Sequence, residues 1–343
     1  MKVFVHFQPK YTKDVYEGMR LRKNIKGALE LNNVEIAKNS LDNYDLAHFL
    51  SIEDETKIND VLEQNIPVVF SALMCESDPV AKVTDTTLNG QTILRPKALR
   101  ILNKVNLVIV PNKTSKEFLK EQGVKTKIAI LSPGVNISRF TKEGEVEGEL
   151  FYRYFRLQKD VKTIIAFGQY DNKEEVRNFV QIAKLCPDYK FLYFGQAKHM
   201  YTLDSKIRRL IKKSPQNALF NPIVPEDVYR SVMINADIFL IVNRNKFNAI
   251  TMLDAIAAKC QIIGLGPINY DAKVIDKKYA YISNTLPLVS SDIIKFLDKE
   301  IPSNVNKAYS IAKNESLTEI GSKLIELYNN IFEAKNKEGK ANA

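Results

Sequence analysis

The sequence has no tryptophan, only three cysteines and three histidines, and no long apolar run. The cysteines, Cys75, Cys186 and Cys260, lie far apart without a CxxC spacing, which argues against a structural zinc site and indicates a reducing compartment. The histidines are too scattered to suggest a metal site. Because no tryptophan, zinc-finger, RRM or KH signature is present, only charge favours a nucleic-acid partner, and we expect none.

The chain is basic, with 50 Lys and Arg against 40 Asp and Glu and a net charge of +10. Such a surface attracts anionic lipid or phosphorylated ligands. A composition rich in Lys and Asn explains the same charge without any function, and both interpretations stay open at this point. Because no signal peptide or membrane-spanning run is recognisable, we expect a cytoplasmic protein.

Length and composition predict at least two domains, because 343 residues with 45% hydrophobic residues supply two cores. Short apolar runs typical of buried strands alternate with helical segments, as in MKVFVHF at the start and KTIIAFG at 162–168. This alternation predicts an α/β protein with parallel, doubly wound sheets. The polar segment EGEVEGE at 143–149 is expected to be a linker between the two halves.

Residues 236–265 read as one complete strand, loop, helix and strand. Two apolar runs, Ile238 to Val242 and Gln261 to Leu265, flank a segment in which apolar residues recur at helical spacing after Asn248, a suitable N-cap. The loop at 243–247 therefore lies where the carboxyl end of a strand meets a helix N-terminus. Such a corner favours an anionic ligand, for example a nucleotide phosphate.

This stretch, aligned on LDAIAAKCQII, resembles the signature segment of the family 4 retaining glycosyltransferases, which have the GT-B fold. The similarity is greatest to Gram-positive diacylglycerol-glucoside glycosyltransferases, and it includes GVKT at 123–126, SPGVNISRF at 132–140 and NESLTEIG at 314–321. It implies two Rossmann-like domains and a C-terminal helix that crosses back to the first.

The resemblance implies a division of the chain into four parts. We expect residues 1–140 to form the domain facing the acceptor and the membrane, and residues 141–310 to form the domain that binds the nucleotide sugar. Residues 311–335 are expected to form the crossover helix. The polar residues 336–343 are expected to be a disordered tail.

The resemblance also implies a donor site. Its signature contains two glutamates, of which the first contacts the donor sugar and the second the ribose, and the matching positions are Lys246 and Asp254. Lys246 and Arg244 are candidates for the cations that stabilise the departing UDP. The family clamps the diphosphate with two cations, of which Lys173 remains. Arg20 matches a family arginine on the first helix, although a solvated arginine on the helix face is the alternative.

Other family positions are substituted. Glu17 and Met19 replace the two glycines of a turn that approaches the donor, so we expect no tight anion-binding turn. Leu73 replaces a histidine of the loop facing the reaction centre, and Glu174 replaces a cation of the diphosphate clamp, where a carboxylate repels phosphate.

Two carboxylates remain in the loop that follows the strand at 66–73. Glu76 and Asp78, together with Lys246, are the candidate catalytic residues. Ordinary solvation of the loop is the alternative for the two acids.

The segment TILRPKALRILNKV, residues 92–105, is the candidate membrane contact. It mixes apolar and basic residues as an amphipathic interfacial helix does. The alternative is a surface helix whose apolar stripe faces the core. The residues expected to bind the membrane are Arg95, Lys97, Arg100 and Lys104.

Two functions are compatible with these observations. In the first, the chain is a divergent enzyme that transfers a hexose from a UDP-sugar to a monoglycosyl-diacylglycerol or another sugar acceptor at the cytoplasmic membrane face, without a metal or other cofactor. In the second, it is a catalytically inactive GT-B protein that binds a partner glycosyltransferase, a lipid surface or a sugar. The substituted positions favour the second function, and the retained architecture favours the first.

Overall fold

A computed structural model describes the chain except for residues 8–14, 73–80, 142–144, 171, 196–202, 223, 243–248, 267–277 and 342–343. Contacts divide the chain into two compact units, each described by itself below. Unit 1 contains Met1–Val135, Asn248–Ile250 and Asn314–Ala343, and unit 2 contains Asn136–Phe247 and Thr251–Lys313.

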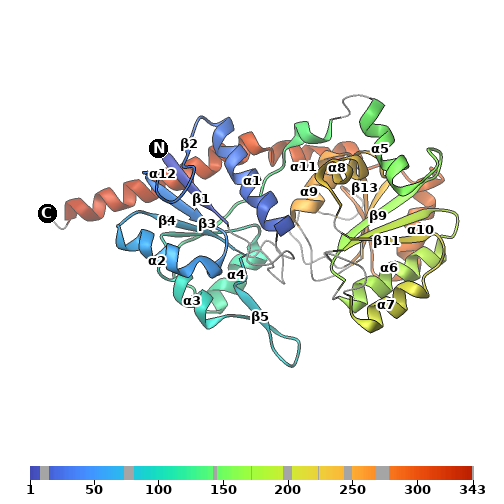
Figure 1. Cartoon of the computed structure of the whole chain (residues 1–343), viewed down its shortest axis with the longest axis horizontal. Coiled ribbons are helices and arrows are strands. Elements are labelled where there is room, and N and C mark those ends of the chain that lie inside the picture. Colours follow the sequence, from blue (N-terminus) through green and yellow to red (C-terminus); the bar gives the residue numbers. More distant parts are fainter. Residues whose placement is uncertain are drawn as a thin grey trace. The chain divides into compact units, whose positions relative to one another are not determined.

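The helices and strands alternate along both units (Figure 1). In the first part of the chain they are β1 (Lys2–His6), α1 (Val15–Leu31), β2 (Glu35–Ile36), β3 (Leu46–Phe49), η2 (Ile52–Asp54), α2 (Glu55–Glu63), β4 (Val68–Ser71), β5 (Thr84–Thr86), β6 (Thr92–Leu94), α3 (Pro96–Leu102), β7 (Leu107–Val110), α4 (Lys113–Glu121), β8 (Ile128–Ile130) and η3 (Ile137–Phe140). They continue as α5 (Glu145–Phe155), β9 (Thr163–Gly168), α6 (Lys173–Leu185), β10 (Lys190–Gly195), α7 (Ser205–Lys212), β11 (Ala218–Asn221), α8 (Glu226–Asn235), β12 (Ile238–Ile241), α9 (Ala249–Ala257), β13 (Gln261–Leu265), β14 (Tyr281–Ser283), α10 (Leu286–Leu297), α11 (Val305–Asn314) and α12 (Leu317–Ala341).

Unit 1 is built on a six-stranded parallel sheet with the strand order β2-β1-β3-β4-β7-β8. Alternate residues of β1 point to opposite faces, as the period of two requires. Val3 and Val5 join the core formed with α1 and α12, whereas Phe4 joins the core formed with α2, α3 and α4. Because helices cover both faces, the strands read as continuous apolar runs in the sequence.

The C-terminal segment returns to unit 1, as the fold prediction required. Val135 forms a parallel bridge with Ser316, and α12 lies along α1. Gly321 allows this close approach, because a Cβ there would lie 2.1 Å from the carbonyl oxygen of Ala28.

Helix α12 runs to Ala341, so residues 336–341 are helical where a disordered tail was expected, and the last two residues of that expected tail lie outside the described residues. The segment consists largely of Lys, Glu, Ala and Asn, and extending an existing helix adds one hydrogen bond for each residue ordered. The polar residues therefore continue the helix.

Unit 2 has a second six-stranded parallel sheet, with the strand order β11-β10-β9-β12-β13-β14. This is the order of a Rossmann sheet, in which the first strand of the unit lies at the centre. Phe179 on α6, Ile207 on α7 and Val289 on α10 belong to the core on one face. The predicted fold class of two parallel, doubly wound α/β domains is confirmed.

The expected linker at 143–149 is wrong for most of its length, because α5 begins at Glu145. The aromatic residues that follow the polar stretch give this helix a face to bury against α8. Phe151 is fully buried, and its backbone N–H donates to Ser231 Oγ at 2.9 Å. Unit 2 also begins earlier than residue 141, since it includes η3.

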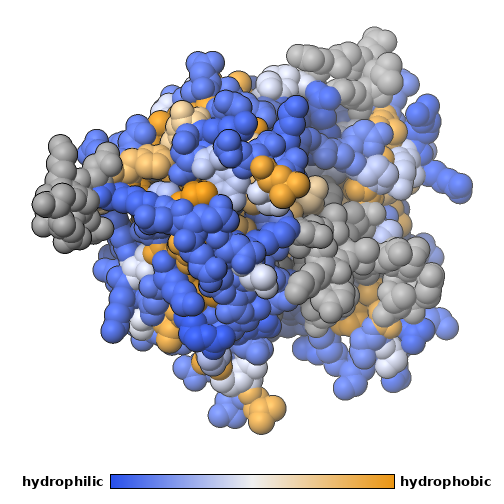
Figure 2. Space-filling model, turned by 60° about the vertical axis from the view of Figure 1, so that its left-hand side comes forward, coloured by the Kyte–Doolittle hydropathy of each residue, from blue (hydrophilic) through white to orange (hydrophobic). Residues whose placement is uncertain are grey.

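The visible face in Figure 2 is mainly hydrophilic, with small and separate apolar areas. Within the part of the chain that the structure describes, none of the helices combines the length and the apolar character that crossing a bilayer requires.

Candidate functional site

Each of the two six-stranded sheets has one place where the strand order reverses. In unit 1 the reversal lies between β1 and β3, and in unit 2 it lies between β9 and β12. Open parallel sheets bind ligands outside the carboxyl ends of their strands at such switch points. The candidate sites are therefore the residues at the carboxyl ends of these two strand pairs.

At the unit 2 switch point, β9 ends in Gly168, and side chains of the same unit occupy the space beside this glycine. A Cβ at Gly168 would lie 1.4 Å from Glu175 Oε1 and 2.4 Å from the Tyr193 hydroxyl oxygen. That hydroxyl donates to Glu175 Oε1 at 3.0 Å, and Glu175 is only 4% exposed. A buried carboxylate thus lies directly against the end of the central strand.

The neighbouring strand β10 ends in the same manner. Its last residue is Gly195, where a Cβ would lie 2.1 Å from the ring of Tyr170. The Tyr170 hydroxyl donates to the Asn221 carbonyl oxygen at 2.8 Å, and burial raises the pKa of this tyrosine. At both strand ends, side chains of the same unit therefore fill the space on the side where a Cβ would lie.

Helix α6 begins beside this switch point, and its N-terminus is capped from within the chain. Asn172 Oδ1 accepts from the Glu175 backbone N–H at 3.3 Å. Lys173 and Glu174, the residues at the predicted diphosphate clamp, are both exposed. One cation and one carboxylate thus reach solvent at the start of the helix, while the next carboxylate points into the core.

Asp254, the predicted ribose ligand, is held in a polar network on α9. Its Oδ2 accepts from the Tyr229 hydroxyl at 2.9 Å, and Arg139 Nη1 lies 4.0 Å away. Arg139 also pairs with Glu226 through Nη2 at 3.1 Å, and its guanidinium lies 5.6 Å from the centre of the Tyr229 ring. Asp254 is 3% exposed, so its side chain is positioned by unit 2 itself.

No pattern in the sequence indicates a role for Arg139, which precedes Phe140 in the segment SPGVNISRF. Two features hold its backbone in place: Arg230 Nε and Nη2 donate to the carbonyl oxygens of Arg139 and Thr141. Arg139, Glu226 and Asp254 come from three separated parts of the chain. Arg139 is recognised as part of the site only because these carboxylates lie beside it in the folded unit.

In unit 1, Arg20 is 6% exposed on α1, so the alternative of a solvated arginine is wrong. Gly18 in the first turns of the same helix is required for packing, because a Cβ there would lie 2.1 Å from the ring of Phe7. Met19, at the second of the family's glycine positions, is 39% exposed. The assignment of Arg20 to donor binding stays a prediction.

The switch point of unit 1 brings together three residues that were not predicted as site residues. His6 Nε2 lies 3.2 Å from Asp54 Oδ1 and 3.4 Å from Lys57 Nζ. The side chains of His6 and Asp54 are 11% and 9% exposed. No local pattern in the sequence links the three residues: His6 lies near the end of the apolar run MKVFVHF, and Asp54 and Lys57 come from a distant segment.

A second histidine lies inside unit 1. His48 on β3 contacts Tyr328 Oη through Nδ1 and Ser71 Oγ through Nε2, both at 2.7 Å. It is 1% exposed, and burial lowers its pKa to about 3. This neutral imidazole connects two adjacent strands to α12 and has a structural role.

The candidate membrane segment at 92–105 is not one interfacial helix, and that expectation is wrong. It forms strand β6 and the short helix α3, and Ala98, Ile101 and Leu102 are buried in the core. The alternative, a surface helix with its apolar stripe on the core, holds for residues 96–102, which form α3.

Three of the four basic side chains of this segment contact other residues of unit 1. Lys97 Nζ and Arg100 Nη2 lie 3.4 and 3.8 Å from the carboxylate of Glu55, and Arg95 Nε donates to the Thr84 carbonyl oxygen. Lys104 is exposed. A membrane contact here would be electrostatic.

Four predicted site residues lie outside the described part of the chain: Glu76, Asp78, Arg244 and Lys246. Among the described residues, no group of three or more His, Cys, Asp or Glu side chains is arranged to hold a metal ion.

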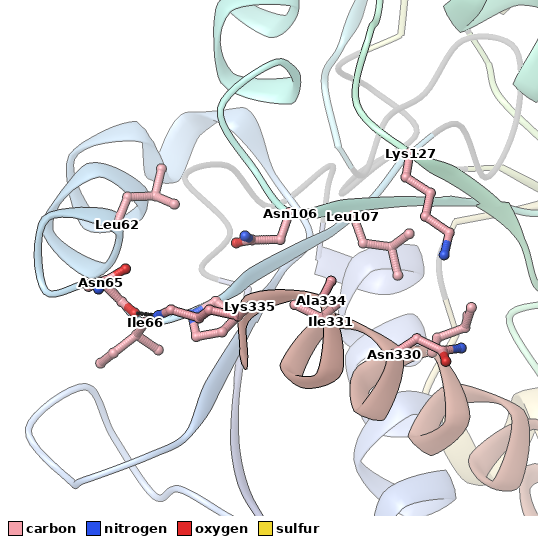
Figure 3. A pocket seen from close by; sticks show the side chains of 12 residues that line it. Leu62, Asn65, Ile66, Asn106, Leu107, Lys127, Asn330, Ile331, Ala334 and Lys335 are labelled. Carbon is pink, nitrogen blue, oxygen red and sulfur yellow. Dashed lines mark hydrogen bonds between the residues drawn. The ribbon is translucent and has the colours of Figure 1, made fainter. Parts of the chain in front are cut away.

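A pocket of about 310 Å³ lies at the opposite, amino-terminal edge of the unit 1 sheet (Figure 3). Its walls include Leu62 on α2, Leu107 at the start of β7 and Ile331 on α12. Lys335 closes one side by donating to the Asn65 carbonyl oxygen. The pocket results from the end of α12 overhanging the sheet, and it is remote in the fold from the switch point.

Comparison with known proteins supports the predicted kinship. Residues 72–133 match the family described as Glucosyltransferase 3-like, N-terminal domain. Over 316 residues the chain is 23% identical to the processive diacylglycerol alpha-glucosyltransferase of Acholeplasma laidlawii, with 90% of this chain and 92% of that protein covered.

Similar solved structures include sucrose-phosphate synthase from Thermosynechococcus elongatus, with a TM-score of 0.71 and 11% identity over 97% of this chain and 99% of that one. Another is Anabaena HepE in complex with UDP-glucose, with a TM-score of 0.67 and 12% identity over 96% and 99%. The chain has the GT-B fold. The resemblance to glycosyltransferases of this fold that the sequence predicted is confirmed.

Proposed function

We propose that this chain is a glycosyltransferase that uses a UDP-sugar and transfers its hexose to a lipid-linked sugar such as a monoglycosyl-diacylglycerol. The observation that carries the proposal is the similarity to the Acholeplasma diacylglycerol glucosyltransferase, which spans 90% of this chain and 92% of that protein. A similarity confined to one domain would support only a shared Rossmann unit. The bound UDP-glucose of the Anabaena structure supports the choice of donor.

The donor belongs to unit 2 in this proposal. Asp254 is the candidate for the ribose contact, with its carboxylate held by Tyr229 and charge-balanced by Arg139. A carboxylate beside a guanidinium is a strong acceptor for hydroxyl groups. Lys173, Arg244 and Lys246 are the proposed cations for the diphosphate. No metal is assigned to this step, since these side chains supply the positive charge.

The direct test is to incubate the purified chain with UDP-glucose or UDP-galactose and monoglucosyl-diacylglycerol in vesicles, and to measure UDP release. Donor binding is measured in parallel by calorimetry. We expect acceptor-dependent UDP release, and Asp254→Asn should weaken donor affinity about tenfold to a hundredfold, because a hydrogen bond to a charged group contributes about 1.5–3 kcal/mol. Asp227→Asn is the matched control, since Asp227 is exposed on α8. Failure to bind either donor would refute the proposal for these sugars.

A second candidate function has its own support. Glu175 and Tyr170 occupy the space beside the terminal glycines of β9 and β10, and Glu174 stands at a position where the family has a cation. These features favour a GT-B protein without transferase activity that binds a sugar, a lipid surface or a partner glycosyltransferase. The same fold is compatible with both functions. Only the transferase requires a diphosphate to bind beside α6.

Charge reversal at Glu174 separates the two candidates. If the diphosphate lies near the α6 N-terminus, Glu174→Lys should tighten UDP binding several-fold, and added salt should reduce the gain. Glu300→Lys makes the same charge change at an exposed site elsewhere in unit 2 and should have little effect. Equal effects of the two variants, or none, would favour the function without a donor.

We further propose that unit 1 contacts anionic lipid through Arg95, Lys97, Arg100 and Lys104. Because the apolar residues of α3 are buried, attraction must come from charge and should disappear at high salt. The test compares sedimentation with anionic and neutral vesicles. Replacing Lys97, Arg100 and Lys104 by Gln should reduce sedimentation more than the same change at Arg208, Lys212 and Lys213, which lie on and just after α7 in unit 2.

A further inference from the structure

The pocket at the amino-terminal edge of the unit 1 sheet lies where three neighbouring strands begin. Strand order places β7 between β4 and β8. Ile66 comes two residues before β4, Asn106 directly precedes β7, and Lys127 directly precedes β8. All three residues line the pocket. Because neighbouring strands lie about 4.8 Å apart, the lining on the β4 side and the lining on the β8 side are separated by about 10 Å along the sheet edge.

The opposite wall is the end of α12, which is less buried than the middle of that helix. Tyr328 is fully buried, whereas Ile331 is partly buried and Ala334 is exposed. On the other wall, Leu62 and Ile66 are also only partly buried against their core. Apolar side chains thus border a space of about 310 Å³, at the lower end of the range of about 300–1,000 Å³ that is typical of ligand pockets.

The polar residues of the pocket are two lysines and three asparagines, and none of its described lining residues is acidic. Lys335 donates to the Asn65 carbonyl oxygen and closes the β4 side. Among the described residues, none forms a hydrogen bond or an ion pair with the Lys127 ammonium. In Figure 3 this ammonium is drawn on the same side of the pocket as Asn330, away from Lys335. One cation is therefore available to a ligand on the β8 side.

Asn106 supplies a neutral donor between the two lysines. Its Oδ1 accepts from the Val68 backbone N–H at 2.8 Å, so the side-chain oxygen is occupied and Nδ2 carries two N–H donors. No described residue accepts a hydrogen bond from this nitrogen. The pocket combines an apolar surface with donors suited to an anionic group.

We propose that this pocket binds a fatty acid, with the carboxylate at Lys127 and the acyl chain along Leu107 and Ile331 toward Leu62. The apolar walls favour a chain, and one available cation balances one negative charge. A phosphate monoester carries about −1.5 to −2 charges near pH 7 and requires further cations. The inference is independent of the proposed transferase, because the whole pocket lies within unit 1 at the edge opposite the switch point.

A ligand in this position connects α12 to the starts of β4, β7 and β8. It binds only when the end of the helix lies against the sheet, so it stabilises that arrangement by mass action. Hydrogen exchange of the amides at 331–341 should therefore slow when the pocket is filled. The amides of α7 in unit 2 should be unaffected.

The test uses octanoate as the probe on the full chain without nucleotide, with binding measured by calorimetry. We expect saturable one-to-one binding. Octanoate should bind about tenfold more tightly than hexanoate, because two further methylene groups leave water. Octanol has the same chain length without the charge and should bind about twofold to fivefold more weakly, since an exposed ion pair contributes little. Octanol binding as tight as that of octanoate, or octyl phosphate binding tenfold tighter, would overturn the assignment to a carboxylate.

Two matched pairs of variants locate the site. Ala334→Phe should fill the pocket and abolish octanoate binding, whereas Asn329→Phe, at an exposed position of the same helix outside the pocket, should change the affinity less than about twofold. Lys127→Gln should weaken octanoate binding about twofold to fivefold and leave octanol binding unchanged. Lys125→Gln, at an exposed position outside the pocket, should change neither.

NMR of the wild-type chain tests the position of the ligand without any substitution. Nuclear Overhauser contacts should join the octanoate methylene protons to the methyl groups of Leu107 and Ile331. The lack of these contacts, binding that does not saturate, or equal effects of Ala334→Phe and Asn329→Phe would overturn the inference. Because no nucleotide takes part, such a failure leaves the transferase proposal intact, and a chain that binds no UDP-sugar leaves the octanoate result unchanged.

Discussion

The buried imidazole of His48 predicts a loss of stability in acid that can be calculated. Burial lowers its pKa from the ordinary 6.5 to about 3 in the folded chain. The unfolded chain therefore binds a proton at pH values where the folded chain does not, and the free energy of unfolding falls as the pH falls below about 6.5 toward 3. At about pH 5 the difference of 1.5 pH units, at about 1.36 kcal/mol each, amounts to about 2 kcal/mol.

The assay must isolate His48 from the carboxylates, which also lose favourable interactions in acid. We compare the wild-type chain with His48→Gln, which cannot take up the proton. Hydrogen exchange of the amides in β3 and β4 reports the free energy of opening in unit 1. Between about pH 7.5 and pH 5, the wild type should lose about 2 kcal/mol more than the variant.

NMR provides a direct check on the cause. The ring signals of His48 should not titrate above about pH 5, because burial in the core disfavours the charged ring. Equal losses of opening free energy in the wild type and in His48→Gln would refute the reasoning. A midpoint near 6.5 for His48 would refute it as well.

Three further predictions concern the backbone, the thiols and one buried hydrogen bond. Gly134→Ala should destabilise unit 1 by about 1–3 kcal/mol in thermal denaturation, because Gly134 has φ +72° and a Cβ would lie 3.1 Å from Leu317; Gly90→Ala, at φ +80° with open space, should cost less. Burial raises the pKa of Cys186 to about 11 and of Cys260 to about 12, so both should resist iodoacetamide near pH 8 in the native chain and react after denaturation, as read by mass spectrometry. Ser231→Ala should cost about 1–3 kcal/mol in chemical denaturation, because it removes the acceptor of the buried Phe151 N–H; Ser138→Ala, at an exposed hydroxyl, should be near neutral.

The sequence predicts the architecture well because strands buried on both faces must be apolar along their whole length. We can therefore recognise strands in the runs Ile238 to Val242 and Leu107 to Val110 without knowing which strands lie beside them. The linker predicted at 143–149 was wrong for most of its length because the residues there are polar and show no apolar pattern. Its polar residues begin a helix whose burial depends on Phe151 and on the distant Ser231.

The residues of the candidate sites also fall into those that the sequence predicts and those that only the structure brings together. Asp254 and Lys173 were predicted because a motif places them at known distances along the chain. Arg139, which balances Asp254, and the pair His6 and Asp54 come from separated segments with no local signal.

The sequence by itself determined that this protein forms two parallel α/β units, because the period and length of apolar runs are local properties of the chain. Only the tertiary structure decided which polar residues meet at the carboxyl ends of the strands. Strand order brings β1 beside β3 and β9 beside β12, and no local pattern specifies that order. The tertiary structure also decided that the apolar residues of 92–105 face the core, since burial depends on what the rest of the chain places against them.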